Sequence, residues 1–206
     1  MEKRQDKLVR LQNLIARGMV RGLDLVTGKD VASIQAFVDR QRQLHPELGK
    51  DHGRMADRLI QKRQWYAAAT SFAWGLGGWW TVVPNVAHIW RIHGRLVLSI
   101  AYVYGYELDD PERREEIALC VALSSANEAV SKMLREAGMV GARKALLTQT
   151  SKEFIKALPN KLVTIAGKKS LTNVSKVVPV VGSVVGGVMD FFSTRGVGKA
   201  AKAFYS

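Results

Sequence analysis

Four histidines and one cysteine are the side chains in this 206-residue sequence that most readily bind metals or act as nucleophiles. His88 and His93 are five residues apart, a spacing that turns them away from each other on a helix. His45 and His52 flank a segment without cysteine or dense carboxylates. Cys120 lies in a predicted helix between apolar residues, where a thiol is usually a small core residue. The sequence therefore predicts no metal site and no cofactor.

The segment AGKKSLT at residues 166–172 resembles part of a phosphate-binding loop. Such a loop requires Gly-x-x-x-x-Gly-Lys followed by Ser or Thr. Here Leu162 replaces the first glycine and Lys169 replaces the Ser or Thr, so we reject a nucleotide site. No Ser–His–Asp or Cys–His arrangement is evident. Whether the protein is an enzyme stays open, and a non-enzymatic role is the favoured interpretation.

One acidic residue and one acidic cluster are candidate functional sites. Asp190 follows an apolar glycine-rich segment and has Arg195 nearby, which makes it the one candidate functional acid. Its favoured interpretation is a salt bridge at a helix end, because structural ion pairs often resemble active sites. The cluster is interpreted as capping and solvated charge, or as a docking point for the basic C-terminal third. It comprises Asp109, Asp110, Glu112, Glu115 and Glu116.

An uncharged, aromatic-rich segment of 27 residues extends from Gln64 to Trp90. Core packing is one interpretation, because aromatic side chains dominate protein cores. A membrane-interface belt is another, because indole rings prefer the head-group level. Base stacking is a third, less favoured interpretation. The expected membrane contacts are Trp74, Trp79, Trp80 and Trp90, followed by Arg91 and Arg95.

The net charge of +13 is concentrated at the C-terminal end of the chain. Residues 143–206 contain 11 Lys or Arg against 2 Asp or Glu, which supplies +9 of the total. Such a surface attracts anionic lipid, nucleic acid or an acidic protein. The single cysteine excludes an internal disulfide and fits a reducing compartment. The lysines expected to meet anionic head groups are Lys161, Lys168, Lys169, Lys176, Lys199 and Lys202.

Helical periodicity dominates the sequence and predicts an all-α fold, an irregular helical bundle. Residues 1–50 are expected to form N-terminal amphipathic helices, over 3–26 and 30–44, and residues 51–206 a second helical unit. Within 51–206 we expect helices from about 51 to 76, from Pro84 to Tyr106, from Pro111 to about 137, and over 141–157. The valine- and glycine-rich run at 177–189 is also expected to be helical.

Glycine and proline interrupt both uncharged runs, which predicts two apolar helical hairpins. The first would turn at residues 75–80 and the second at residues 182–187. A glycine allows two helix backbones to approach closely. The glycines expected to do so are Gly75, Gly77, Gly78, Gly182, Gly186 and Gly187.

Taken together, residues 54–205 resemble the EcsC family. The resemblance is carried by Ala101, Tyr104, Gly105 and Tyr106, by the Pro-Glu-Arg helix start at 111–113, by Pro179, Gly182 and Asp190, and by a basic stretch reaching Tyr205. It implies a bacterial, mostly helical, hydrophobic protein without established catalytic residues or cofactor. The family's namesake is encoded beside a transporter linked to protein secretion. This chain has Asn85 where the family pattern has an acidic residue, so no role of that acid is transferred.

These observations predict a protein that binds the cytoplasmic face of an anionic membrane, peripherally or partly inserted, with a membrane transporter or another protein as a further partner. A bilayer-spanning segment is a less favoured form of the same prediction. The alternatives are a soluble helical bundle that binds a protein or an apolar ligand, and a nucleic-acid-binding protein.

Overall fold

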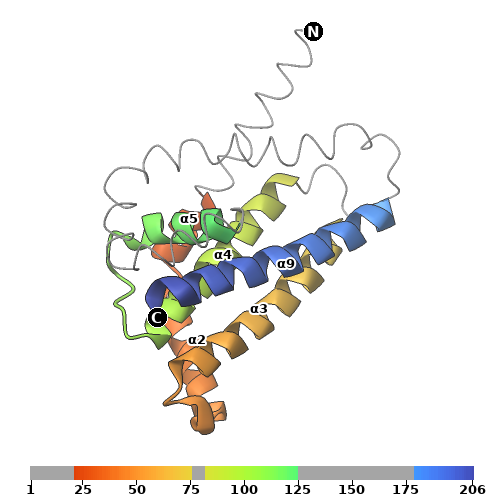
Figure 1. Cartoon of the computed structure of the whole chain (residues 1–206). Coiled ribbons are helices and arrows are strands. Elements are labelled where there is room, and N and C mark those ends of the chain that lie inside the picture. The colour runs from red at the N-terminus through yellow and green to blue at the C-terminus, as the bar shows by residue number, and fades with distance from the viewer. Residues whose placement is uncertain (1–20, 76–81, 125–178) are drawn as a thin grey trace.

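The computed structural model describes residues 21–75, 82–124 and 179–206, and within these ranges the regular structure is helical (Figure 1). This confirms the predicted all-α bundle. A helical segment at residues 21–27 comes first. It is followed by α2 (Val31–Leu44), the short 3₁₀ helix η1 (Pro46–Leu48), α3 (His52–Gly75), α4 (Val82–Val103), α5 (Arg113–Ser124) and α9 (Pro179–Tyr205).

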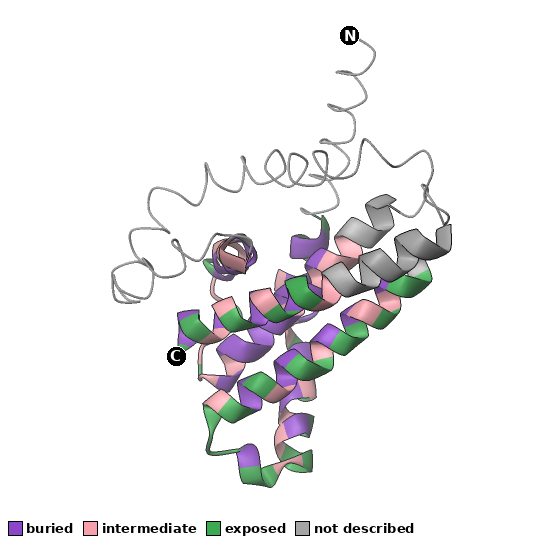
Figure 2. Cartoon of the chain, turned by 45° about the vertical axis from the view of Figure 1, so that its right-hand side comes forward, coloured by how far each residue is buried: buried purple, intermediate pink, exposed green. Residues whose placement is uncertain are grey.

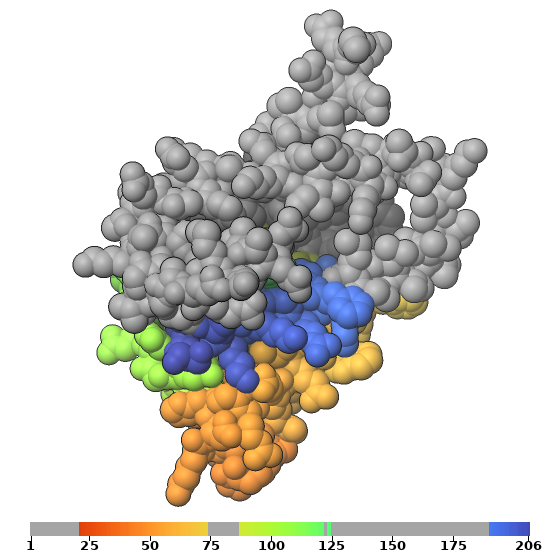
Figure 3. All heavy atoms as spheres, viewed as in Figure 1, coloured from red at the N-terminus to blue at the C-terminus, as the bar shows by residue number. Residues whose placement is uncertain are grey.

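Helices α3 and α9 form the most extensive helix pair in the described part of the chain (Figures 1 and 3). The pair is antiparallel, because Lys202 contacts Asp57 at one end and Phe191 contacts Trp65 further along. The backbones approach closely at Gly198, where a Cβ would lie 2.5 Å from a side-chain carbon of Ile60. A larger residue at 198 would therefore force the two helices apart.

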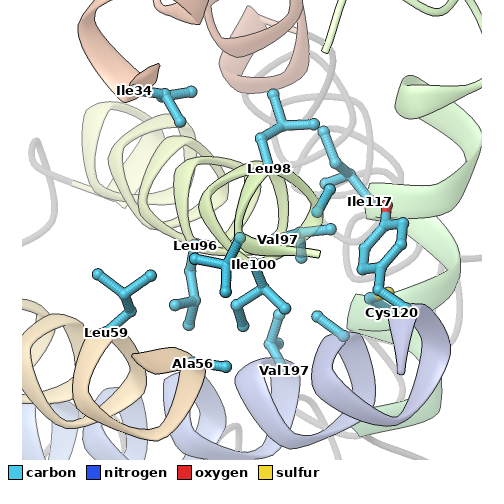
Figure 4. Packing of buried hydrophobic residues seen from close by; sticks show 14 of the residues in the cluster. Ile34, Ala56, Leu59, Leu96, Val97, Leu98, Ile100, Ile117, Cys120 and Val197 are labelled. Carbon is cyan, nitrogen blue, oxygen red and sulfur yellow. The ribbon is translucent and has the colours of Figure 1, made fainter. Parts of the chain in front are cut away.

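Helix α4 passes through the middle of the bundle and packs against α2, α3, α5 and α9. Its residues 96–101 are buried on every side, which explains why the sequence LVLSIA carries no charge. Figure 4 shows Leu96 and Ile100 of α4 beside Leu59 of α3 and Val197 of α9. Buried residues follow the inward faces of the helices, and exposed residues follow the outer faces of α3 and α9 (Figure 2).

The described part of the N-terminal region shares this core. Ile34 and Val38 of α2 belong to the same apolar cluster as the residues of α4. Gly22 lies against α4, where a Cβ would be 2.7 Å from the Cβ of Trp90. Residues 21–44 therefore pack onto the helices that follow residue 50.

Three helix boundaries differ from the sequence-based expectation by two residues or more. Helix α4 begins at Val82 rather than at Pro84. Helix α4 ends at Val103, before Tyr106, because Gly105 has a φ of 87° and turns the chain out of the helix. Helix α5 begins at Arg113, two residues later than predicted from Pro111. The Asp110 carboxylate instead accepts a hydrogen bond from the Glu112 amide in the turn that precedes the helix.

The second glycine-rich run does not form the corner of a hairpin. Residues 182–187 lie inside α9, which continues from Pro179 to Tyr205 without a break. Glycine costs about 1 kcal/mol inside a helix relative to alanine, and the extensive packing of α9 on α3 offsets that cost. Pro179 occupies the first helical position, where its missing N–H is not needed.

Candidate functional site

The bundle has an uncharged end, which we define as residues 64–75 of α3, 82–90 of α4 and 179–189 of α9. None of these three segments contains Lys, Arg, Asp or Glu. Ring contacts bring these segments, or residues directly beside them, together. The ring centres of Tyr66 and His88 are 6.3 Å apart, and those of Trp65 and Phe191 are 5.0 Å apart. Three helix segments without charge therefore converge in one region of the molecule.

Exposed aromatic side chains lie on and beside this uncharged end. Trp65, Phe72 and Phe192 are 63%, 43% and 61% exposed, and Tyr66 is also exposed. Trp65 and Phe72 are seven residues apart and so share one face of α3. The remaining large exposed apolar residue in the described chain is Leu44, at the end of α2. Grouped exposed apolar side chains are typical of an interaction surface.

A cavity of about 370 Å³ opens between α2, α3 and α4, next to the uncharged end. We call it the arginine pocket, because three guanidinium-bearing residues on two helices line it. Its lining consists of Phe37, Arg63, Tyr66, His88, Arg91, Ile92 and Arg95.

Asp30 is the acidic residue that pairs with arginines of this pocket in the described structure. Arg91 donates hydrogen bonds from Nε and Nη2 to the two carboxylate oxygens of Asp30, each at 2.6 Å. Arg95 Nη1 lies 3.1 Å from Oδ1 of the same carboxylate. Asp30 is buried, yet the hydrogen bond from Arg91 holds the pKa of its carboxyl below the usual range. The sequence does not indicate this cluster, because Asp30 is 61 residues from Arg91.

Arg63 is placed differently from the other two arginines. Its guanidinium carbon lies 4.5 Å from the centre of the Phe37 ring, and its Nε is buried without a hydrogen-bond partner among the described residues. Burial, and secondarily the charge of Arg95, lower the pKa of Arg63 to about 10. Burial and the charge of Arg91 also lower the pKa of His88. The pocket therefore holds more positive charge than Asp30 balances.

The structure separates the residues that were predicted to contact a membrane. Trp90 is buried in the core, where it cannot reach a head group in this conformation. Arg91 and Arg95 line the arginine pocket. Lys202 pairs with Asp57 at 2.7 Å, and Lys199 lines a groove of about 650 Å³ with Arg54, Arg58 and Arg195. Trp74 and Gly75 lie in the last turn of α3, and Gly182, Gly186 and Gly187 lie in α9.

The other predicted contacts lie outside the described residues. They are Gly77, Gly78, Trp79, Trp80, Lys161, Lys168, Lys169 and Lys176.

Asp190 does not form the predicted salt bridge with Arg195 in the described structure. It lies within α9 rather than at a helix end, and it faces the buried Ser71 of α3. Burial raises the pKa of the Asp190 carboxyl, and Ser71 offsets this only in part. Arg195 lines the groove between α3 and α9 instead.

A second polar cluster is closed off from solvent at the opposite end of the α3–α9 pair. Glu116 is fully buried and accepts hydrogen bonds from Arg113 and, at 2.6 Å, from the Tyr205 hydroxyl. Arg113 also donates to the Glu107 carbonyl and stacks over Tyr106. The interpretation of Glu116 as solvated charge was therefore wrong. Three parts of the resemblance meet at this cluster: the turn that contains Tyr106, the Pro-Glu-Arg segment at 111–113, and Tyr205. The cluster joins α4, α5 and α9.

Neither a membrane-spanning helix nor a cluster of metal ligands is present within residues 21–75, 82–124 and 179–206. No helix in these ranges combines the length and hydropathy that a bilayer crossing requires. No group of three or more His, Cys, Asp or Glu in the same ranges is arranged to hold a metal ion.

Comparison with known proteins identifies one family. No curated protein and no solved structure is similar enough to count as a match. The model of the EcsC protein family matches residues 50–206, which include α3, α4, α5, α9 and the buried Glu116 cluster. The chain therefore belongs to the EcsC protein family.

Proposed function

We propose that this protein binds the cytoplasmic face of an anionic membrane peripherally, with its uncharged end directed toward the acyl chains. The observation that carries the proposal is the grouping of Trp65, Phe72 and Phe192 beside three uncharged helix segments. A water-exposed aromatic side chain gains on the order of 1.5–3 kcal/mol when it is fully buried. Partial insertion of three such side chains supports reversible binding.

The dimensions favour partial insertion over spanning. The uncharged part of α3 covers residues 64–75, which corresponds to roughly 18 Å of helix at 1.5 Å per residue. The hydrocarbon core of a bilayer is about 30 Å thick. Charged residues begin directly beyond the uncharged segments, with Arg63 on α3 and Arg91 on α4. Such residues at the boundary suit the head-group level.

Positive charge on neighbouring surfaces supports attraction to anionic lipid. Arg54, Arg58, Arg195 and Lys199 line the groove between α3 and α9, and Asp57 is the one acidic residue among the described residues that line it. This attraction extends over about a Debye length, roughly 8 Å at physiological salt. The basic residues closest to the uncharged end therefore contribute most, each on the order of 1 kcal/mol. This attraction orients the protein, and the aromatic side chains hold it at the surface.

Vesicle flotation tests the proposal. We expect the wild-type protein to float with phosphatidylglycerol-containing vesicles and to stay unbound with pure phosphatidylcholine. The double variant Phe72→Ser/Phe192→Ser should lose most of this binding, because it removes exposed apolar surface. Its melting temperature should change little, since both side chains are solvent-exposed.

The matched control is Leu44→Ser, which removes an apolar side chain of similar exposure, 57%, at the end of α2. It should float like the wild type. Equal binding by the wild type and the double variant would contradict the proposed orientation. Retardation of DNA with a steep salt slope, in the absence of vesicle binding, would favour the nucleic-acid alternative instead.

A further inference from the structure

The arginine pocket has the composition of an anion site. Arg63 reaches it from α3, and Arg91 and Arg95 reach it from α4. Guanidinium groups present planar arrays of N–H donors that match the oxygens of phosphate and carboxylate groups. Because they come from two packed helices, the groups are held at a fixed spacing before any ligand arrives.

The three arginines of the pocket are not equally paired with acidic residues. Asp30 takes both hydrogen bonds from Arg91 and the ion pair from Arg95. Arg63 forms no ion pair with the described residues, and its buried Nε has no hydrogen-bond partner among them. Its guanidinium carbon lies 4.5 Å from the centre of the Phe37 ring. A partly buried cation without an anionic partner lowers the stability of the folded protein. A residue that costs stability and lines a cavity is better explained by binding than by folding.

The remaining walls of the pocket are apolar or aromatic. Phe37, Tyr66 and Ile92 face the same cavity as the arginines. Its volume of about 370 Å³ falls within the range of small-molecule sites, about 300–1,000 Å³. A ligand that combines a doubly acidic head with an apolar part would use both kinds of wall.

We infer that the arginine pocket binds a phosphate-type oxyanion carried on a partly apolar molecule, with Arg63 as the principal ligand-binding residue. The phosphate of a lipid head group and that of a soluble phosphate ester share this chemistry. The pocket borders the uncharged end through Tyr66 and His88, so either source can reach it. The inference depends on the pocket alone and holds whether or not the protein binds membranes.

Isothermal titration without vesicles tests the inference and keeps it separate from flotation. The probes are dihexanoyl phosphatidic acid below its micelle concentration and inorganic phosphate, at constant ionic strength. We expect the wild type to bind, and Arg63→Met to raise the dissociation constant about tenfold or more, as loss of a charge-assisted hydrogen bond predicts. Tighter binding of the lipid than of inorganic phosphate assigns a head-group phosphate whose apolar part uses the pocket walls, whereas equal affinity would contradict a ligand with an apolar part.

The matched control is Arg40→Gln, which removes one positive charge from an exposed position on α2. It should bind like the wild type. Arg63→Met should melt at or above the wild-type temperature, which separates lost binding from lost folding. Absence of binding by the wild type, or equal weakening in Arg63→Met and Arg40→Gln, would overturn the inference.

Discussion

The two ends of the α3–α9 pair differ in whether they contain charged residues. At the charged end, where α3 begins and α9 finishes, Lys202 pairs with Asp57 and Tyr205 hydrogen-bonds to Glu116. At the uncharged end the same two helices carry no Lys, Arg, Asp or Glu over 64–75 and 179–189. Exposed aromatic side chains are found there instead.

This difference assigns stability to the charged end and interaction to the uncharged end. The Glu116 cluster is closed and satisfied, so it fixes how α4, α5 and α9 meet. The uncharged end has exposed apolar side chains, and the adjacent arginine pocket has more cation than anion. Interaction surfaces commonly cost stability that the rest of a fold must supply. Substitutions at the two ends should therefore have different consequences.

The largest effect is expected at the charged end. Arg113→Met would remove the Arg113 guanidinium from its contact with the fully buried Glu116. Removing one member of a buried ion pair typically lowers the free energy of unfolding by about 3–5 kcal/mol. Chemical denaturation measures this, and Arg114→Met, which breaks the partly exposed pair with Asp24, is the matched control. A loss below about 1 kcal/mol for Arg113→Met, the range of exposed pairs, would refute the assigned role.

A smaller, pH-dependent effect is expected between the two ends, at His93. This side chain is buried against Thr194 of α9, and burial lowers its pKa from 6.5 to about 4. Below pH 6.5 the unfolded chain gains a proton that the folded chain does not bind, so stability falls as the pH drops toward 4. The expected loss is on the order of 3 kcal/mol.

Unfolding curves of the wild type and His93→Gln between pH 7 and pH 4 isolate this contribution. The comparison is needed because the raised pKa of Asp190 acts in the opposite sense and stabilises the fold as the pH falls. The variant should show a flatter dependence than the wild type. Parallel curves would show that His93 binds protons equally in both states.

The smallest effect is expected for the exposed ion pair at the charged end. Lys202→Met breaks the 2.7 Å contact with Asp57, whose side chain is mostly solvent-exposed. Exposed pairs contribute about 0–1 kcal/mol, so the melting temperature should barely change. If Lys202→Met destabilises as much as Arg113→Met, the contrast between the buried and exposed parts of the charged end is lost.

The positions of the helices could be predicted from the sequence more accurately than their packing against one another. The period of apolar residues located α2, α3 and α4. The run at 177–189 was expected to be helical, and α9 confirms this from Pro179 onward. The hairpin corner predicted at 182–187 was wrong, because packing on α3 overrides the local preference of glycine.

The burial of individual side chains and the pairing of residues distant in sequence could not be predicted either. Glu116 lies in an acidic run whose members look alike, and only the position of Tyr205, 89 residues later, singles it out. The pairing of Asp30 with Arg91 is equally distant in sequence. The core position of Trp90 depends on the approach of the helix that contains Gly22.

Quenching by brominated lipids tests the central claim most directly. A bimane fluorophore is attached to a cysteine at Phe72→Cys or, as control, at Leu44→Cys. The native Cys120 should stay unlabelled, because it is buried and burial raises the pKa of its thiol. On anionic vesicles we predict strong quenching at position 72 and little at position 44. Equal quenching at both positions, or none at position 72, would contradict insertion through the uncharged end.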